Sequence, residues 1–176
     1  MRSLIFLFAA SLFLSSCSRS DTEVNDDNEG ITTVQLSFAP QSGSSKVLDY
    51  YWRDGKGDVI QLEKNVDYSL SVSYLNESGL QTQDLTTEIE DESDAHLIIL
   101  KSTPEDLFSI SAMDKDSKGR KLGLKNKVKA KNNAAGGNLR VILKHQPPIN
   151  GRETKDGMDE NIGSTDSDVS FPVSIK

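Results

Sequence analysis

The sequence predicts a mostly β fold: a single antiparallel β-sandwich, immunoglobulin-like, with one short helix or acidic loop. Two observations carry this prediction. Apolar and polar residues alternate in five separate runs, and turn-forming sequences lie between them. Alternation at a period of two directs one side chain into a core and the next into water, as in an antiparallel sheet with one solvated face. The alternating apolar residues are Val34, Leu36 and Phe38; Leu70, Val72 and Tyr74; Phe108, Ile110 and Ala112; Leu139, Val141 and Leu143; and Val169, Phe171, Val173 and Ile175.

The first residues have the pattern of an export signal. Arg2 precedes an apolar run from Leu4 to Leu14, which is shorter than the ~20 residues that a membrane-spanning helix needs. The ending Leu14-Ser15-Ser16-Cys17 resembles the lipobox of bacterial lipoproteins. We therefore expect residues 1–16 to be a signal peptide and Cys17 to be acylated, which anchors the protein to a membrane through its lipid.

The mature chain is expected to consist of a tether and one domain. Residues 17–30 are polar and acid-rich, which is typical of a flexible acidic tether, and residues 31–176 suffice for one β-sandwich domain. Cys17 is the only cysteine, so the domain has no disulfide and no thiolate ligand. The net charge of −7 disfavours nucleic acid as a partner.

Three segments depart from simple alternation. Thr82 to His96 is acidic and places Leu85 and Ile89 four residues apart, which favours a short helix or an acidic loop. The following run, His96 to Leu100, is apolar enough to predict a central strand. Lys144 to Asp168 contains two prolines and three glycines and is too long for a hairpin turn, so we expect a mobile or functional loop.

The two histidines are the candidate metal ligands. His96 and His145 each lie at the edge of a predicted strand, and Glu92 and Asp94 precede the first. Two imidazoles with carboxylates could hold Zn²⁺, Cu²⁺ or Fe²⁺ if the two strands are neighbours. The alternative is that both are hydrogen-bonded structural residues, because their spacing matches no metal motif.

Other charged segments have simpler interpretations. Asp114 to Gly119 resembles the start of a calcium loop but lacks its later acidic ligands, so we expect a hairpin turn with solvated charges. A further group of acidic residues is expected to lie in a solvated loop: Asp156, Asp159, Glu160, Asp166 and Asp168.

A basic strip and an aromatic cluster complete the candidates. Lys118 to Lys131 carries six lysines and one arginine, which indicates an exposed, edge-protecting hairpin arm or a surface for an anionic partner. Tyr50, Tyr51 and Trp52 are expected to divide between core packing and an exposed stacking surface.

Over nearly its whole length the chain resembles a family of small, poorly characterised Bacteroidota lipoproteins. The segments that carry the resemblance are the lipobox, Thr87 to His96, Asp114 to Gly123, Leu139 to Pro147 and Asp166 to Ile175. Members are often encoded beside a TonB-dependent receptor, so the resemblance implies a receptor accessory in nutrient uptake. Some carry the labels GTP cyclohydrolase or type 1 periplasmic binding domain, and the residues argue against both: a zinc cyclohydrolase needs a Cys and His ligand set, and a bilobed binding protein needs a longer chain with βαβ patterning.

The sequence contains no Ser-His-Asp pattern, no phosphate-binding glycine loop and no dinucleotide fingerprint. We therefore expect a non-enzymatic, lipid-anchored protein of the outer membrane, on its periplasmic or cell-surface side, that binds a ligand or partner. One alternative is a metal-binding lipoprotein that uses His96 and His145. Another is a structural or adhesive surface lipoprotein with no small ligand.

Overall fold

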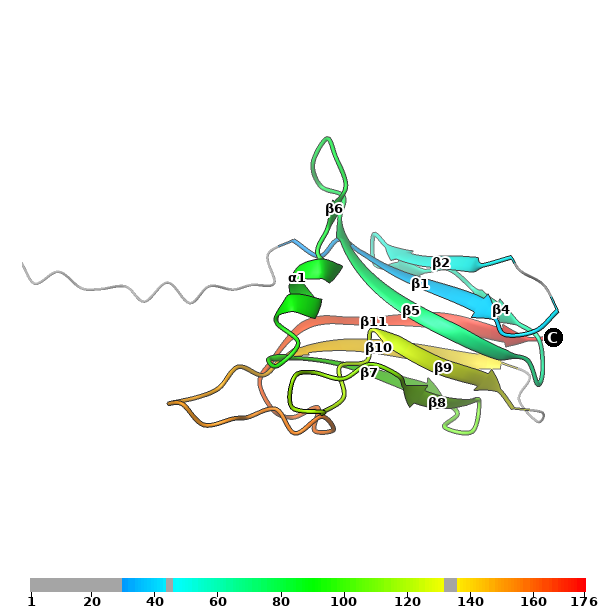
Figure 1. Cartoon of the computed structure of the whole chain (residues 1–176). Helices are drawn as coiled ribbons and strands as arrows, with labels where there is room; N and C mark the ends of the chain where they lie inside the picture. The colour runs from blue at the N-terminus through cyan, green and yellow to red at the C-terminus, as the bar shows by residue number, and fades with distance from the viewer. Residues whose placement is uncertain (1–29, 44–45, 132–135) are drawn as a thin grey trace, which may run out of the picture.

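The computed structural model describes residues 30–43, 46–131 and 136–176. The predicted signal peptide, Cys17 and the tether as far as residue 29 lie outside the described residues. Two sheets lie face to face, and one short helix lies at the end where the described chain begins (Figure 1). The elements are β1 (Thr33–Pro40), β2 (Leu48–Arg53), β3 (Lys56–Gly57), β4 (Ile60–Leu62), β5 (Asp67–Asn76), β6 (Gln83–Asp84), α1 (Thr86–Asp91), β7 (His96–Thr103), β8 (Phe108–Ala112), β9 (Lys125–Ala130), β10 (Gly136–His145) and β11 (Ser164–Ile175).

The strand order confirms the predicted β-sandwich. One sheet has the order β3-β2-β1-β5-β9-β8, with β6 added to β5, and the other has the order β4-β11-β10-β7. Pairing is antiparallel except between β4 and β11, which run parallel. The immunoglobulin-like assignment stays a prediction.

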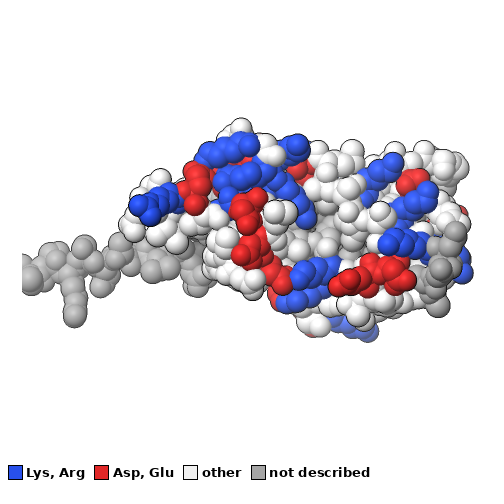
Figure 2. Space-filling model, turned by 90° about the horizontal axis from the view of Figure 1, so that it is seen from below, with Lys and Arg blue, Asp and Glu red and all other residues white. Residues whose placement is uncertain are grey.

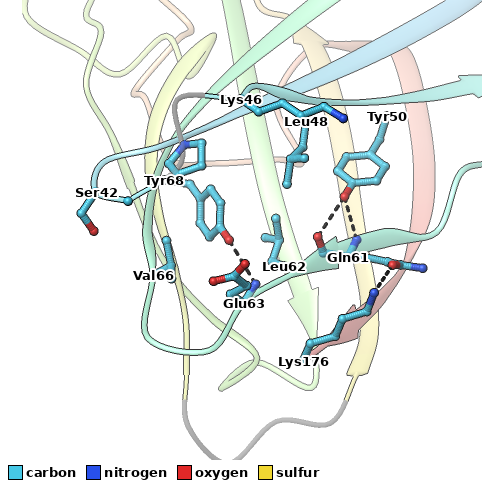
Figure 3. Close-up of a pocket in the computed structure, with 12 residues that line it drawn as sticks. Ser42, Lys46, Leu48, Tyr50, Gln61, Leu62, Glu63, Val66, Tyr68 and Lys176 are labelled. Carbon is cyan, nitrogen blue, oxygen red and sulfur yellow. Dashed lines mark hydrogen bonds between the residues drawn. The ribbon is translucent and has the colours of Figure 1, made fainter.

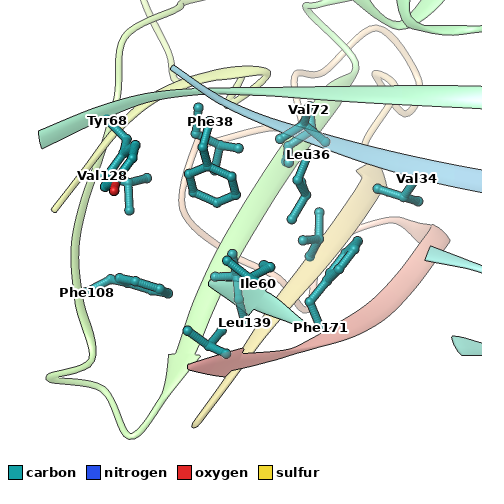
Figure 4. Packing of buried hydrophobic residues seen from close by; sticks show 14 of the residues in the cluster. Val34, Leu36, Phe38, Ile60, Tyr68, Val72, Phe108, Val128, Leu139 and Phe171 are labelled. Carbon is teal, nitrogen blue, oxygen red and sulfur yellow. The ribbon is translucent and has the colours of Figure 1, made fainter. Parts of the chain in front are cut away.

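The core lies between the sheets and is built from the alternating residues. Val34, Leu36 and Phe38 of β1 are fully buried, as are Leu139 of β10 and Phe171 of β11. Figure 4 shows the β1 side chains pointing across the inter-sheet space toward Leu139 and Phe171. All five alternating runs form strands, so the period-two pattern identified them correctly.

The short helix in the acidic segment is also confirmed. α1 has no side-chain cap at its N-terminus, and its one buried residue is Ile89. Burial of Ile89 in the main core cluster, rather than capping, is therefore what holds this six-residue helix in place. Among the described residues no helix is long and apolar enough to cross a bilayer.

The prediction that His96 to Leu100 forms a central strand was wrong, because β7 is at the edge of its sheet. The run is apolar because both of its faces are buried: Ile98 is in the main core, whereas Leu97 and Ile99 pack with Ile142 in a second cluster. The exposed edge is also partly covered, since the Ile98 N–H donates to the Leu122 carbonyl oxygen at 2.7 Å. Because both of its faces are buried, this edge strand has the continuous apolar sequence that is typical of a central strand.

Within the basic strip, Lys125 to Ala130 forms β9, which lies inside its sheet, so the prediction of an edge-protecting arm was wrong for this part. β9 pairs with β5 on one side and β8 on the other. Its lysines point to solvent between buried neighbours, and Lys125 and Lys129 form ion pairs with Glu90 and Asp67. Figure 2 shows basic and acidic side chains interspersed over the face seen from below, without a large patch of one sign.

The aromatic cluster divides as predicted. Tyr50 and Trp52 of β2 pack against the core, and Tyr50 makes an edge contact with Phe38 at 6.0 Å between ring centroids. Tyr51 lies on the other face, where the Arg53 guanidinium is 4.2 Å from the centre of its ring.

In the turn at Asp114 to Gly119, Lys115 and Lys118 are exposed, but Asp116 is not solvated, contrary to the sequence prediction. The Asp116 side chain is fully buried and pairs with Lys155 at 3.0 Å and with Arg120 at 2.7 Å. Lys155, also fully buried, donates to the Ser93 carbonyl oxygen at 2.7 Å, and Arg120 pairs with Glu153 at 2.9 Å. This set, which we call the Asp116 cluster, joins the α1–β7, β8–β9 and β10–β11 connections. Only the fold brings these segments together.

The Asp116 cluster predicts a loss of stability in acid. Burial raises the pKa of Asp116, but hydrogen bonds from Lys155 and Arg120 outweigh it and lower the pKa from 3.8 to about 2. Because the folded-state pKa lies below the ordinary value, the carboxylate stabilises the fold above pH 3.8, and this contribution is lost as the pH falls toward 2. The difference in urea midpoint between the parent and Asp116→Asn should therefore be constant above pH 5 and shrink toward pH 2. A difference independent of pH would contradict this prediction.

Candidate metal site

His96 and His145 meet because their strands pair in register. His96 is the first residue of β7 and His145 is the last of β10, and these antiparallel strands place the two residues directly opposite each other. Side chains of an opposed pair lie on the same face of a sheet. Here that face is the core side, at the end of the sandwich beside α1 (Figure 1). The strand neighbourhood that the metal hypothesis required is therefore present.

The two imidazole rings are stacked. Their centroids are 4.9 Å apart and their planes differ by 17°. His96 is buried, whereas His145 is half-buried. One nitrogen of each ring lies within 4.8 Å of the other, so one ion beside the stack can reach both.

Glu92 is the carboxylate that joins them. It follows α1 directly, and its Oε2 lies 4.0 Å from Nδ1 of His96, while its carbonyl oxygen lies 3.3 Å from the same nitrogen. One ligand atom from each of Glu92, His96 and His145 lies within 4.8 Å of the others. Ligand atoms on a tetrahedral Zn²⁺ are about 3.4 Å apart. Closing this difference requires a small movement of the ligand side chains, of which that of Glu92 is 51% exposed.

Asp94, the other carboxylate suggested by the sequence, is not part of this group. It accepts hydrogen bonds from the Ser117 hydroxyl at 2.7 Å and from the Ser117 N–H at 3.1 Å. Hydrogen bonds from the Ser117 side chain and backbone, together with the charge of Lys118, lower the pKa of Asp94. Its place is therefore beside the Asp116 cluster.

Asp166 is a site residue that the sequence analysis missed. We expected it in a solvated loop, but its side chain is only 7% exposed and its Oδ2 lies 3.8 Å from Nε2 of His96. Alternation along β11 puts the odd-numbered residues from Val169 onward in the core, so an even-numbered residue should point outward. No signal in the sequence reveals the exception.

Gly163 fixes the chain beside His145. Its φ is +72°, and a Cβ there would lie 2.0 Å from the His145 carbonyl oxygen. Only glycine fits this conformation and this close approach. The end of the β10–β11 connection is thereby held against the last residue of β10.

A larger cleft of about 360 Å³ opens at the opposite end of the sandwich, between β2 and β4 (Figure 3). This volume is within the usual range for small-molecule sites. Its polar groups bond mainly to one another: the Tyr50 hydroxyl bonds to the Gln61 backbone and the Tyr68 hydroxyl accepts the Glu63 N–H. Its lining contains no histidine or cysteine, so the imidazole pair is the stronger candidate site.

Comparisons with models of protein families, with curated proteins and with solved structures gave no match.

Proposed function

We propose that this chain is a lipid-anchored, non-enzymatic protein of the outer membrane that binds a divalent transition metal through Glu92, His96 and His145. The observation that carries the metal proposal is the direct cross-strand pairing of the chain's two histidines, with their rings stacked 4.9 Å apart. Imidazole and carboxylate together suit Zn²⁺, Cu²⁺ and Fe²⁺.

A bound cation would also balance the local chemistry. The space between the sheets is otherwise apolar, and His96 is buried at its end beside Ile31, Leu85 and Leu143. A dication beside the two rings would bind their lone pairs and neutralise the charge of Glu92.

The proposed membrane location and the proposed receptor partner are both supported by the sequence. The apolar run that ends at Cys17 supports a lipid anchor, and the family resemblance supports a TonB-dependent receptor as the partner. Ile31, at the start of the domain, lines the small pocket beside His96. In an anchored protein the metal site would therefore lie close to where the tether joins the domain.

The first prediction is that metal stabilises the folded protein. Residues 18–176 contain every described residue and omit the acylation site. With Zn²⁺, Cu²⁺ or Fe²⁺ added singly after chelation, the ion that binds should add about 2.7 kcal/mol at a hundredfold excess over its Kd. This corresponds to a rise in Tm of roughly 5–10 °C. His96→Ala and His145→Ala should each abolish the rise relative to their own metal-free form.

Asp94→Asn is the matched control, because Asp94 is close in sequence to Glu92 but binds Ser117. Its metal-dependent rise in Tm should equal that of the parent. If no ion shifts the parent, or if the histidine variants respond as the parent does, the proposal fails. A structural or adhesive role would then be the better explanation.

A further inference from the structure

A β-bulge directs the side chain of Asp166 toward the interior at the end of the sandwich. The register between β10 and β11 pairs Leu143 with Ser167 but Lys144 with Thr165, so Asp166 is the extra residue. Such bulges re-aim a side chain and are frequent beside functional sites. Here the bulge directs a carboxylate toward Nε2 of His96, on the opposite side of that ring from Glu92.

The small pocket between α1 and these residues has the size of a cation site. Its volume is about 40 Å³, enough for one ion with a bound water. Glu88, Glu92, His96 and Asp166 supply its polar wall, and aliphatic side chains supply the rest. The pocket lining contains neither cysteine nor methionine, so no soft ligand is present.

In the same region, Tyr74 has a buried hydroxyl without a hydrogen-bond partner in the described part of the chain. Its side chain is fully buried, and its hydroxyl has no hydrogen-bond partner among the described residues. The backbone of Tyr74 bonds to Leu85 and Thr86 at the start of α1. Burial, followed by the charge of Asp166, raises the pKa of Tyr74 far above its ordinary value, so the hydroxyl remains a neutral donor near that carboxylate.

We propose that Asp166 is a positioning residue of the metal site: its carboxylate accepts the Nε2–H of His96, which leaves Nδ1, on the Glu92 side, to bind the ion. The Tyr74 hydroxyl in turn donates to Asp166. This inference rests on the proposed function and specifies its ligand class. Two imidazoles and the Glu92 carboxylate, with a water in the fourth position, suit a borderline divalent ion such as Zn²⁺, which Co²⁺ mimics. Ca²⁺ and Mg²⁺, which prefer all-oxygen sites with more ligands, are selected against.

The test is a Co²⁺ titration of residues 18–176 followed by visible absorption, because four-coordinate Co²⁺ absorbs far more strongly than the six-coordinate ion. Asp166→Asn keeps the shape and removes the charge. It should weaken Co²⁺ binding about 10- to 100-fold, the loss expected from an outer-shell partner of a histidine ligand, but leave the strong bands at saturation, because the ligands themselves are unchanged. Asp166→Glu, which retains a carboxylate, should recover part of the affinity.

Asp168→Asn is the matched control. Asp168 lies two residues further along β11, where it pairs with Arg140 outside this pocket, and Co²⁺ binding should be unchanged. Tyr74→Phe removes only one oxygen from a packed ring, so it serves as the second variant if Asp166→Asn does not fold. It should weaken binding several-fold with the same number of bound ions.

The outcomes separate the two proposals. If the parent binds no Co²⁺ or Zn²⁺, the proposed function itself fails. If the parent binds and His96→Ala does not, but Asp166→Asn and Tyr74→Phe bind as the parent does, only the present inference is overturned. Ca²⁺ competing with Co²⁺ at equal concentration would overturn the assigned ligand class.

Discussion

Asp116→Ala is expected to lower the free energy of unfolding by about 3–5 kcal/mol, because it breaks a buried ion pair and leaves a charge without its partner. The group left without its ion-pair partner is the Lys155 ammonium, whose side chain is fully buried. It would keep only its hydrogen bond to the Ser93 carbonyl oxygen. Asp116 also accepts the backbone N–H groups of Lys118 and Arg120, so the turn loses two more bonds. Urea unfolding at pH 7 measures the effect.

Glu153→Gln provides the comparison within the same cluster. Glu153 pairs with Lys118 and Arg120, but its side chain is 45% exposed, and exposed pairs contribute less than about 1 kcal/mol. The two variants should therefore differ severalfold. Equal costs would mean that burial of the Asp116 cluster does not determine its contribution.

Phe171→Ala is expected to cost about 3–5 kcal/mol, through lost burial and the cavity left behind. Phe171 is fully buried on β11, and its ring also lies against Gly57 of β3, where a Cβ would come within 3.2 Å of Cδ1. Removing the ring therefore opens a space that reaches both sheets. Equilibrium unfolding in urea gives the free energy.

Two further variants test the cause. Phe171→Leu keeps much of the volume and should cost less than about 1.5 kcal/mol. Ser170→Ala, at the exposed neighbouring position, should stay within about 0.5 kcal/mol. A small cost for Phe171→Ala would indicate that the core collapses around the missing ring.

The sequence predicts those features of the fold that depend on local periodicity. Val34, Leu36 and Phe38 alternate with polar residues and are fully buried, and Leu85 and Ile89 indicated the short helix correctly. Periodicity reports how many faces of a strand are buried, but it does not report the strand's neighbours. For that reason β7 was expected in the centre of its sheet and the lysines of β9 at an edge.

The candidate site was half predictable. His96 and His145 could be named as the chain's two imidazoles, but only the pairing of β7 with β10 places them together. Asp166 could not be identified, because a one-residue bulge reverses its direction and leaves no trace in the pattern. Asp94 was misleading, since closeness in sequence to His96 does not determine which way a turn directs its carboxylate.

The position of β1 has a mechanical consequence. β1 begins two residues after Ile31 and is hydrogen-bonded to β2 on one side and β5 on the other. Force applied through the preceding residues pulls along β1, at right angles to its inter-strand hydrogen bonds, and loads them together in shear instead of unzipping them one by one. A domain held to a membrane by its N-terminal end would therefore take the load on a strand that is paired on both sides, while Ile31, on the wall of the pocket beside His96, would be the first described side chain to bear the tension.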